Sequence, residues 1–103
     1  MRWQLPLFAV LVSGPSMAPA LRSGDALLVR RGGRRVRAGD VVVARFRTRP
    51  DLLVVKRAIR EQDGGWWIQG DNGLVEDDSR RYGVADVIGR VLIRYYPRPG
   101  RLG

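Results

Sequence analysis

Short apolar stretches rich in valine, leucine and isoleucine alternate along the chain with polar positions and with Gly, Asp and Pro. Stretches of this length between turn residues predict β-strands, and no segment keeps the 3.6-residue apolar period that would predict a helix. We therefore expect six strands, at Leu7–Val12, Ala26–Arg30, Val41–Phe46, Leu52–Ile59, Trp66–Gln69 and Val91–Tyr96.

Turn residues indicate how these strands are connected. Gly-Asp pairs begin at residues 24, 39 and 70 and mark turns or strand entries, and Asp63-Gly64-Gly65 predicts a hairpin turn. Short strands with tight turns and no crossover helices favour a closed or two-layered sheet over a parallel α/β sheet. The expected fold class is all-β, a small barrel or sandwich of mostly antiparallel strands.

The length of 103 residues is enough for one hydrophobic core, so we expect a single domain over residues 1–103. Residues 72–82 contain few apolar side chains and predict a surface loop. Residues 97–103 contain two prolines and two glycines and predict a frayed tail.

The chain contains no histidine and no cysteine. A Ser/His/Asp triad, a cysteine protease, a disulfide framework and a zinc site built on imidazole or thiolate are therefore excluded. Any catalysis must use Ser, Thr, Lys, Tyr or carboxylates, and we expect neither a metal nor another cofactor.

The chain contains nineteen basic and ten acidic residues, which gives a net charge of +9. All the basic residues except one are arginine. Arginine-biased codon usage accounts for such a composition. A basic surface also attracts nucleic acid or anionic lipid. Because the arginines are scattered and no basic helix is predicted, we expect no nucleic-acid partner.

The apolar run Leu5–Val12 is interrupted by Pro6 and is too short to cross a bilayer, which takes about 20 apolar residues in a helix. We interpret the run as the start of the first strand rather than as a signal peptide or membrane anchor. A soluble, cytoplasmic protein is the resulting expectation.

Ser16 has the most suggestive setting among the hydroxyl side chains. It follows a predicted strand inside Ser13-Gly14-Pro15-Ser16-Met17, where Gly and Pro can force a sharp, rigid turn that projects the side chain outward. An ordinary Ser/Pro loop would have the same composition. Met17 is expected to pack into the core beside it.

Lys56 is the only lysine of the chain and follows the apolar residues Leu52–Val55. A buried lysine can lower its pKa from about 10.4 toward about 7–8, which leaves a neutral amine that can accept a proton. A lysine of this kind beside a serine hydroxyl is a known variant of triad chemistry. The alternative is a strand-end lysine whose ammonium group reaches solvent.

The order and spacing of several motifs resemble the type I signal peptidase family of serine peptidases. The matching segments are Gly14–Leu21 with Gly24-Asp25, Gly39–Val42, Val54–Ala58, Gly70–Asn72, Asp78–Arg80, Tyr82–Val84 and Ile88–Arg90. The resemblance implies that Ser16 is the nucleophile and Lys56 the general base. We further expect a protein substrate that binds as an extended strand along an exposed edge near Ser16.

The resemblance extends to the residues around the site. It implies that Asp78 and Arg80 form a structural salt bridge and that Asp71 and Asn72 shape the active-site loop. Where many members carry a serine that orients the lysine, and where some carry a serine that binds the oxyanion, this chain has Glu76 and Gly14.

Within this family, the segments around Ser16, Leu52–Ala58 and Gly64–Asn72 look most like the proteases that mature nickel-type superoxide dismutase. That likeness implies removal of an N-terminal propeptide from the dismutase precursor. Three other functions stay open: cleavage of exported preproteins, self-cleavage as in repressor-type Ser/Lys domains, and a non-catalytic basic β-module that binds nucleic acid or anionic lipid. Trp66 and Trp67 are expected to pack in a hairpin.

Overall fold

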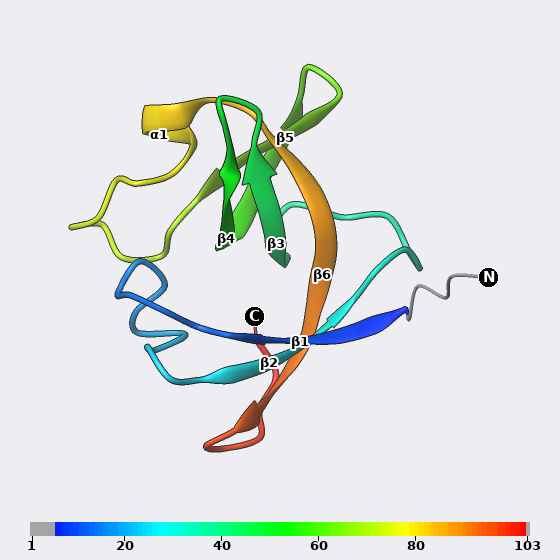
Figure 1. Ribbon diagram of the computed structural model, residues 1–103, viewed down its shortest axis with the longest axis vertical. Coiled ribbons are helices and arrows are strands. Elements are labelled where there is room, and N and C mark those ends of the chain that lie inside the picture. The colour runs from blue at the N-terminus through cyan, green and yellow to red at the C-terminus, as the bar shows by residue number, and fades with distance from the viewer. Residues whose placement is uncertain (1–5, 103) are drawn as a thin grey trace.

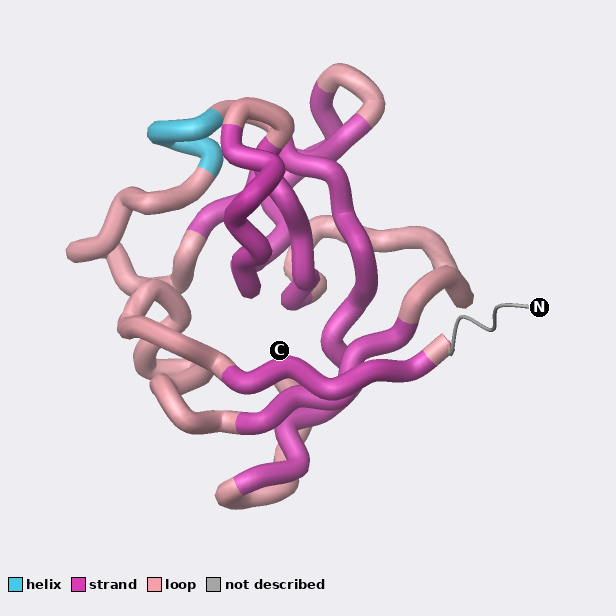
Figure 2. Tube along the Cα trace, viewed as in Figure 1, coloured by secondary structure: helices cyan, strands magenta, loops and turns pink. Residues whose placement is uncertain are grey.

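A computed structural model describes residues 6–102, so Leu5 of the apolar N-terminal run and Gly103 of the tail lie outside the described residues. Strands make up about half of the trace, with one short helix among the described residues (Figure 2). In chain order the elements are β1 (Leu7–Leu11), β2 (Ala26–Arg30), β3 (Val41–Phe46), β4 (Arg49–Gln62), β5 (Gly65–Gln69), α1 (Ser79–Tyr82) and β6 (Ala85–Tyr96).

The six strands form one sheet in the order β1-β2-β6-β3-β4-β5. Every pairing is antiparallel, and a further bridge between Trp66 and Ala85 joins β5 back to β6. β3, β4, β5 and β6 therefore close into a small barrel, while β1 and β2 extend the sheet from the other end of β6 (Figure 1). The predicted all-β class is confirmed.

Two apolar cores follow from this arrangement. Alternate residues of β3 point to opposite faces, so Val42, Ala44 and Phe46 fill the closed barrel while Val41 and Val43 face the second core. Both faces of β3 are buried, which is why its sequence is an almost continuous apolar run. The second core lies between β3 and the sheet of β1, β2 and β6.

The β4–β5 hairpin forms at the predicted place. Asp63 has φ of 52° and Gly64 has φ of 76°, and Gln62 pairs with Gly65 across them. Positive φ at both central residues is the geometry of a type I′ turn, for which an Asp-Gly pair is preferred.

Two strands are longer than their apolar runs predict. β6 begins at Ala85 rather than at Val91, because Asp86, Gly89 and Arg90 belong to the strand although they interrupt the apolar pattern. Gly89 fits there because a Cβ at this position would lie 2.6 Å from a methyl group of Val29. β4 likewise extends beyond the predicted Leu52–Ile59 at both ends.

The segment after β6 turns back on the strand, in the region for which the sequence predicts fraying. Arg94 and Gly100 exchange two backbone hydrogen bonds of 2.9 Å each. Leu102 packs against the second core.

We predict that Phe46→Ala lowers the free energy of unfolding by about 3–5 kcal/mol, because the side chain is fully buried and contacts Tyr82. Leu74→Ala is the matched control, since Leu74 is 94% exposed, and should change stability by less than about 0.5 kcal/mol. Urea denaturation of the two variants measures both values. Similar losses in both would contradict this assignment of the core.

Candidate active site

The loop that carries Ser16 connects β1 to β2 and is closed at its base. The backbone N–H of Val12 donates to Asp25 O at 2.8 Å, and Gly24 N–H donates to Val12 O at 2.9 Å. Met17 and Leu21 are buried in the second core and anchor the loop, which confirms the expected packing of Met17. Ser16 itself stays partly exposed.

A second loop, residues 70–78, holds the Ser16 loop from the side. The backbone N–H of Asn72 donates to Ser16 O at 2.9 Å, and the Asn72 side-chain amide donates to Pro15 O at 3.0 Å. Gly70 lies so close that a Cβ there would be 2.5 Å from Ser16 O. The position of Ser16 therefore depends on a segment more than fifty residues away in sequence.

Asp78 fixes the base of this second loop. Its buried carboxylate accepts hydrogen bonds from Gly70 N at 2.9 Å, from Arg80 N at 3.1 Å and from the Arg80 guanidinium, with a shortest contact of 2.6 Å. Burial alone would raise the pKa of Asp78, but these hydrogen bonds and the Arg80 charge outweigh it and hold the pKa below its usual range. The predicted salt bridge between Asp78 and Arg80 is present.

Lys56 lies in the middle of β4, opposite Val42 of β3, and is only 4% exposed. Burial lowers the pKa of the Lys56 amine, while the charges of Asp78 and Asp77 oppose this shift and that of Arg80 adds to it. Among the described residues 6–102, no side chain forms an ion pair with Lys56. The environment therefore favours the neutral amine.

Ser16 and Lys56 line the same cleft, which has a volume of about 350 Å³. One wall is the end of β1 and the residues after it, and the other is the first half of β4. The remaining lining is mostly apolar: Val10, Leu11, Val12, Ser13, Met17, Val43, Leu52, Leu53, Val54 and Val55. The structure thus brings together the two residues that sequence reasoning selected, from segments forty residues apart.

An ion pair between Arg57 and Asp71 ties the strand of Lys56 to the loop that holds Ser16. The guanidinium of Arg57 donates to both carboxylate oxygens of Asp71, at 3.2 and 2.6 Å, and to Gly39 O at 2.9 Å. Sequence analysis assigned Asp71 to the loop but missed its partner. The only feature of the sequence that could have pointed to Arg57 as the partner of Asp71 is its position directly after Lys56.

Two other hydroxyl side chains form hydrogen bonds within the structure. Ser79 is buried and accepts a hydrogen bond from Ile68 N at 2.8 Å, and Thr48 donates to Tyr82 O at 2.8 Å. Glu76 stands where many family members carry the serine that orients the lysine. It is exposed and has no hydroxyl group, so it does not reproduce that serine.

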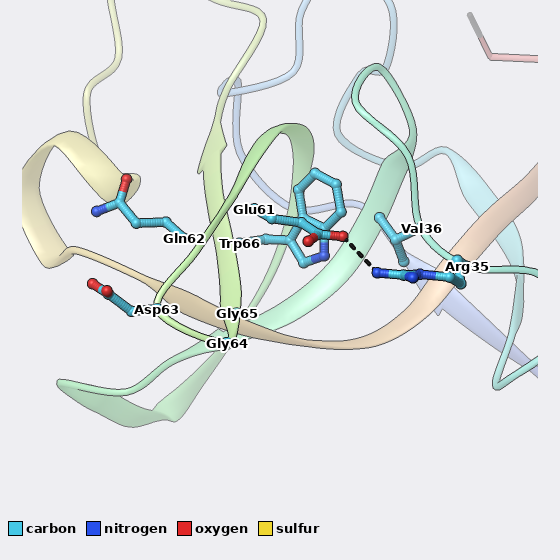
Figure 3. Close-up of a pocket in the computed structure, with 8 residues that line it drawn as sticks. All are labelled: Arg35, Val36, Glu61, Gln62, Asp63, Gly64, Gly65 and Trp66. Atoms are coloured by element: carbon cyan, nitrogen blue, oxygen red, sulfur yellow. Dashed lines mark hydrogen bonds and ion pairs between the residues drawn. The ribbon is translucent and has the colours of Figure 1, made fainter.

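A separate hollow of about 490 Å³ lies at the β4–β5 hairpin and contains neither Ser16 nor Lys56. Figure 3 shows the side chains of Arg35 and Glu61 pointing toward one another, with Trp66 beside them. The ion pair between them measures 2.9 Å. Arg35 is therefore neutralised within the protein.

Residues 6–102 contain no cluster of three or more Asp, Glu, His or Cys side chains that could hold a metal ion. No helix in this part of the chain is long and apolar enough to span a membrane.

Comparison with known proteins identifies the family. Residues 3–92 match the family described as Peptidase S24-like, and the chain belongs to this family. Mitochondrial inner membrane protease subunit 1 of Xenopus tropicalis is 32% identical over 114 residues, which cover 85% of this chain and 68% of that protein. Mitochondrial ATP-independent inner membrane protease subunit 1a of Arabidopsis thaliana is 30% identical, with 84% and 68% covered.

A third relative is the signal peptidase complex catalytic subunit sec11 of Pyrenophora tritici-repentis, 32% identical over 81% of this chain and 54% of that protein. These matches confirm the resemblance to signal peptidases, and this protein is a peptidase of the signal-peptidase type. They do not support the narrower likeness to the nickel superoxide dismutase maturation proteases.

The comparisons also correct the expected location. A cytoplasmic protein was the expectation from the short N-terminal apolar run, and it is wrong. The relatives are named as mitochondrial inner membrane proteases and as a signal peptidase complex subunit, which are membrane-associated. The length of an apolar run tests only whether that run can span a bilayer, so it could not decide the location.

We predict that Gly70→Ala lowers the kcat/KM of the peptidase by about a hundredfold, because the added methyl group would push the Ser16 backbone out of place. Gly73→Ala is the control in the same loop, since a Cβ there meets nothing within 4 Å. Steady-state cleavage of one peptide by both variants measures the difference. Equal activities would show that contact with Gly70 does not position Ser16.

Proposed function

We propose that this protein is a serine endopeptidase in which Ser16 is the nucleophile and neutral Lys56 is the general base. The observation that carries the proposal is the shared cleft. Its lining includes both the partly exposed Ser16 and Lys56, which is 4% exposed. The lowered pKa of Lys56 supports the same assignment. A lysine base also suits a chain that contains no histidine.

In the proposed mechanism the Lys56 amine accepts the proton of the Ser16 hydroxyl as Oγ attacks the carbonyl carbon of the scissile bond. The tetrahedral intermediate collapses to an acyl-enzyme, and the Lys56 ammonium gives its proton to the leaving amine. A water molecule then transfers a proton to Lys56, attacks the ester and releases the acyl group. Ser16 regains its proton, which restores both residues.

The oxyanion requires hydrogen-bond donors that point into the cleft. Gly14 supplies no hydroxyl, so a backbone donor must serve. The N–H of Ser16 makes no hydrogen bond within the described part of the chain, which leaves it free for this role. The hydrogen bond from Asn72 to Ser16 O supports the orientation of the same peptide segment.

We propose that the substrate binds as an extended strand between β1 and β4. β1 pairs only with β2, and the first half of β4 pairs only with β3, so each has one edge without a partner strand among the described elements. Residues of both strands line the cleft. A peptide between them could hydrogen-bond to either edge while its side chains enter the apolar cleft.

The finer proposal concerns the substrate. The likeness of Gly64–Asn72 to the nickel superoxide dismutase maturation proteases favours the N-terminal propeptide of a dismutase precursor. A signal peptide of an exported preprotein is the alternative, favoured by the relatives named as signal peptidase subunits. Incubating the purified protein with each precursor and identifying the new N-terminus by mass spectrometry separates the two. A single cut at the propeptide junction is the expected result, and cleavage of the preprotein alone would refute it.

We predict that Ser16→Ala and Lys56→Met each reduce kcat/KM by at least about 10²–10⁴-fold. Lys56→Met should not lower the unfolding temperature, because it replaces a poorly solvated amine with an apolar side chain of similar length. Ser13→Ala is the control, since Ser13 lines the same cleft but is exposed. A folded Lys56→Met variant that cleaves at the parent rate would exclude the general-base role.

The pH dependence of kcat/KM should rise from acid to alkaline pH. Burial lowers the pKa of Lys56 in the folded protein, and only the neutral amine can accept the Ser16 proton. Activity is therefore expected to fall as the pH drops through the folded-state pKa of Lys56. A rate that is flat on the acid side, measured where the protein remains folded, would count against a lysine base.

A further inference from the structure

The tip of the β3–β4 hairpin carries one arginine more than the neighbouring carboxylates neutralise. The Arg49 guanidinium donates to both oxygens of Asp51, at 3.2 Å each. The Arg47 guanidinium donates to Asp86 of β6, with a shortest contact of 2.8 Å. Arg45 is exposed and forms no ion pair within residues 6–102, although Asp86 is its register partner. The charge of Arg45 is therefore free to bind an anion.

Arg45 stands on the face of β3 that contributes to the peptidase cleft. Side chains two residues apart in a strand point to the same face, and Val43, two residues before Arg45, lines the cleft. β4 lies beside β3 (Figure 1), and its residue Leu53 is the register partner of Arg45. Leu53 also lines the cleft and is 48% exposed. The mostly apolar lining of the cleft therefore ends beside a positive charge.

The position of this charge relative to the catalytic pair follows from the strand geometry. Leu53 lies three residues before Lys56 on β4, which corresponds to about 10 Å along a strand. A substrate strand on the free edge of β4 advances by the same rise per residue. If its residue opposite Lys56 adjoins the scissile bond, its residue opposite Leu53 is the fourth from that bond.

The side chain of this fourth substrate residue projects from the same face as Leu53 and Arg45, because directly paired residues share a face of the sheet. The substrate residue and Arg45 are then two strand spacings apart, about 10 Å. Two long side chains can meet over Leu53 across this distance, with the aliphatic stem of Arg45 covering the leucine. A guanidinium binds a carboxylate through two parallel hydrogen bonds.

From this arrangement we propose that Arg45 is a specificity-determining residue that binds an acidic side chain of the substrate, glutamate above all, at the fourth residue from the scissile bond. The inference rests on the proposed peptidase function and on strand addition to β4. Glutamate is preferred to aspartate because its side chain is longer. The contact is remote from the reacting atoms, so it lowers KM and leaves kcat unchanged.

The test uses synthetic peptides that span the cut identified by mass spectrometry, with Glu, Gln or Lys at the fourth residue before or after it. At the position that pairs with β4, the parent protein should cleave the Glu peptide with a kcat/KM about two- to fivefold above that of the Gln peptide. R45Q should abolish this preference, and R45E should favour the Lys peptide instead. High ionic strength should weaken both preferences, because salt screens exposed charges.

The matched control is R101Q, which removes the same charge from an exposed position in the segment after β6. It should keep the preference of the parent protein. Equal kcat/KM values of the parent for the Glu, Gln and Lys peptides would overturn the inference and leave the peptidase function standing. An equal loss of preference in R101Q would reduce the effect to net charge and also overturn it. Cleavage of none of the peptides would refute the peptidase function on which the inference rests.

Discussion

The removal of water from the Lys56 amine is the constraint on which the rest of this site depends. An ammonium group on a side chain that is only 4% exposed is destabilised relative to the neutral amine, and burial lowers the pKa of Lys56 accordingly. β4 supplies the burial, because it pairs with β3 next to Lys56 and places apolar side chains around it. A neutral amine can act as a base only if a proton donor lies in the same space, and Ser16 lines that cleft.

Polar contacts around the cleft position two loops that lie outside the sheet: the loop that carries Ser16 and residues 70–78. Asp78 binds Gly70 and Arg80. Asn72, two residues after Gly70, binds the backbone of the Ser16 loop. Arg57 joins the same loop to β4 through Asp71. The barrel therefore orients Lys56 directly, while Ser16 is oriented through contacts of its loop with Gly70 and Asn72.

Sequence reasoning was most successful where the signal is local. The apolar run of β3 and the Asp-Gly turn at residues 63–64 determine their own structure, and both formed where predicted. The sequence pattern did not predict the start of β6, because Asp86 and Gly89 break the apolar pattern. Their extended conformation depends on contacts with neighbouring strands, which the pattern does not contain. The partnership of Arg57 with Asp71 was invisible for the same reason: it exists only after β4 and the 70–78 loop meet.

The central claim is that burial lowers the pKa of Lys56 in the folded protein, and the chain allows a direct measurement because it contains a single lysine. Labelling the protein with ¹³C-lysine gives one side-chain Cε signal, whose chemical shift can be followed by NMR across a pH titration. The account predicts a titration midpoint clearly below the 10.5 of a solvated lysine, and a return to that value after unfolding. A folded-state midpoint at or above 10.5 would contradict it.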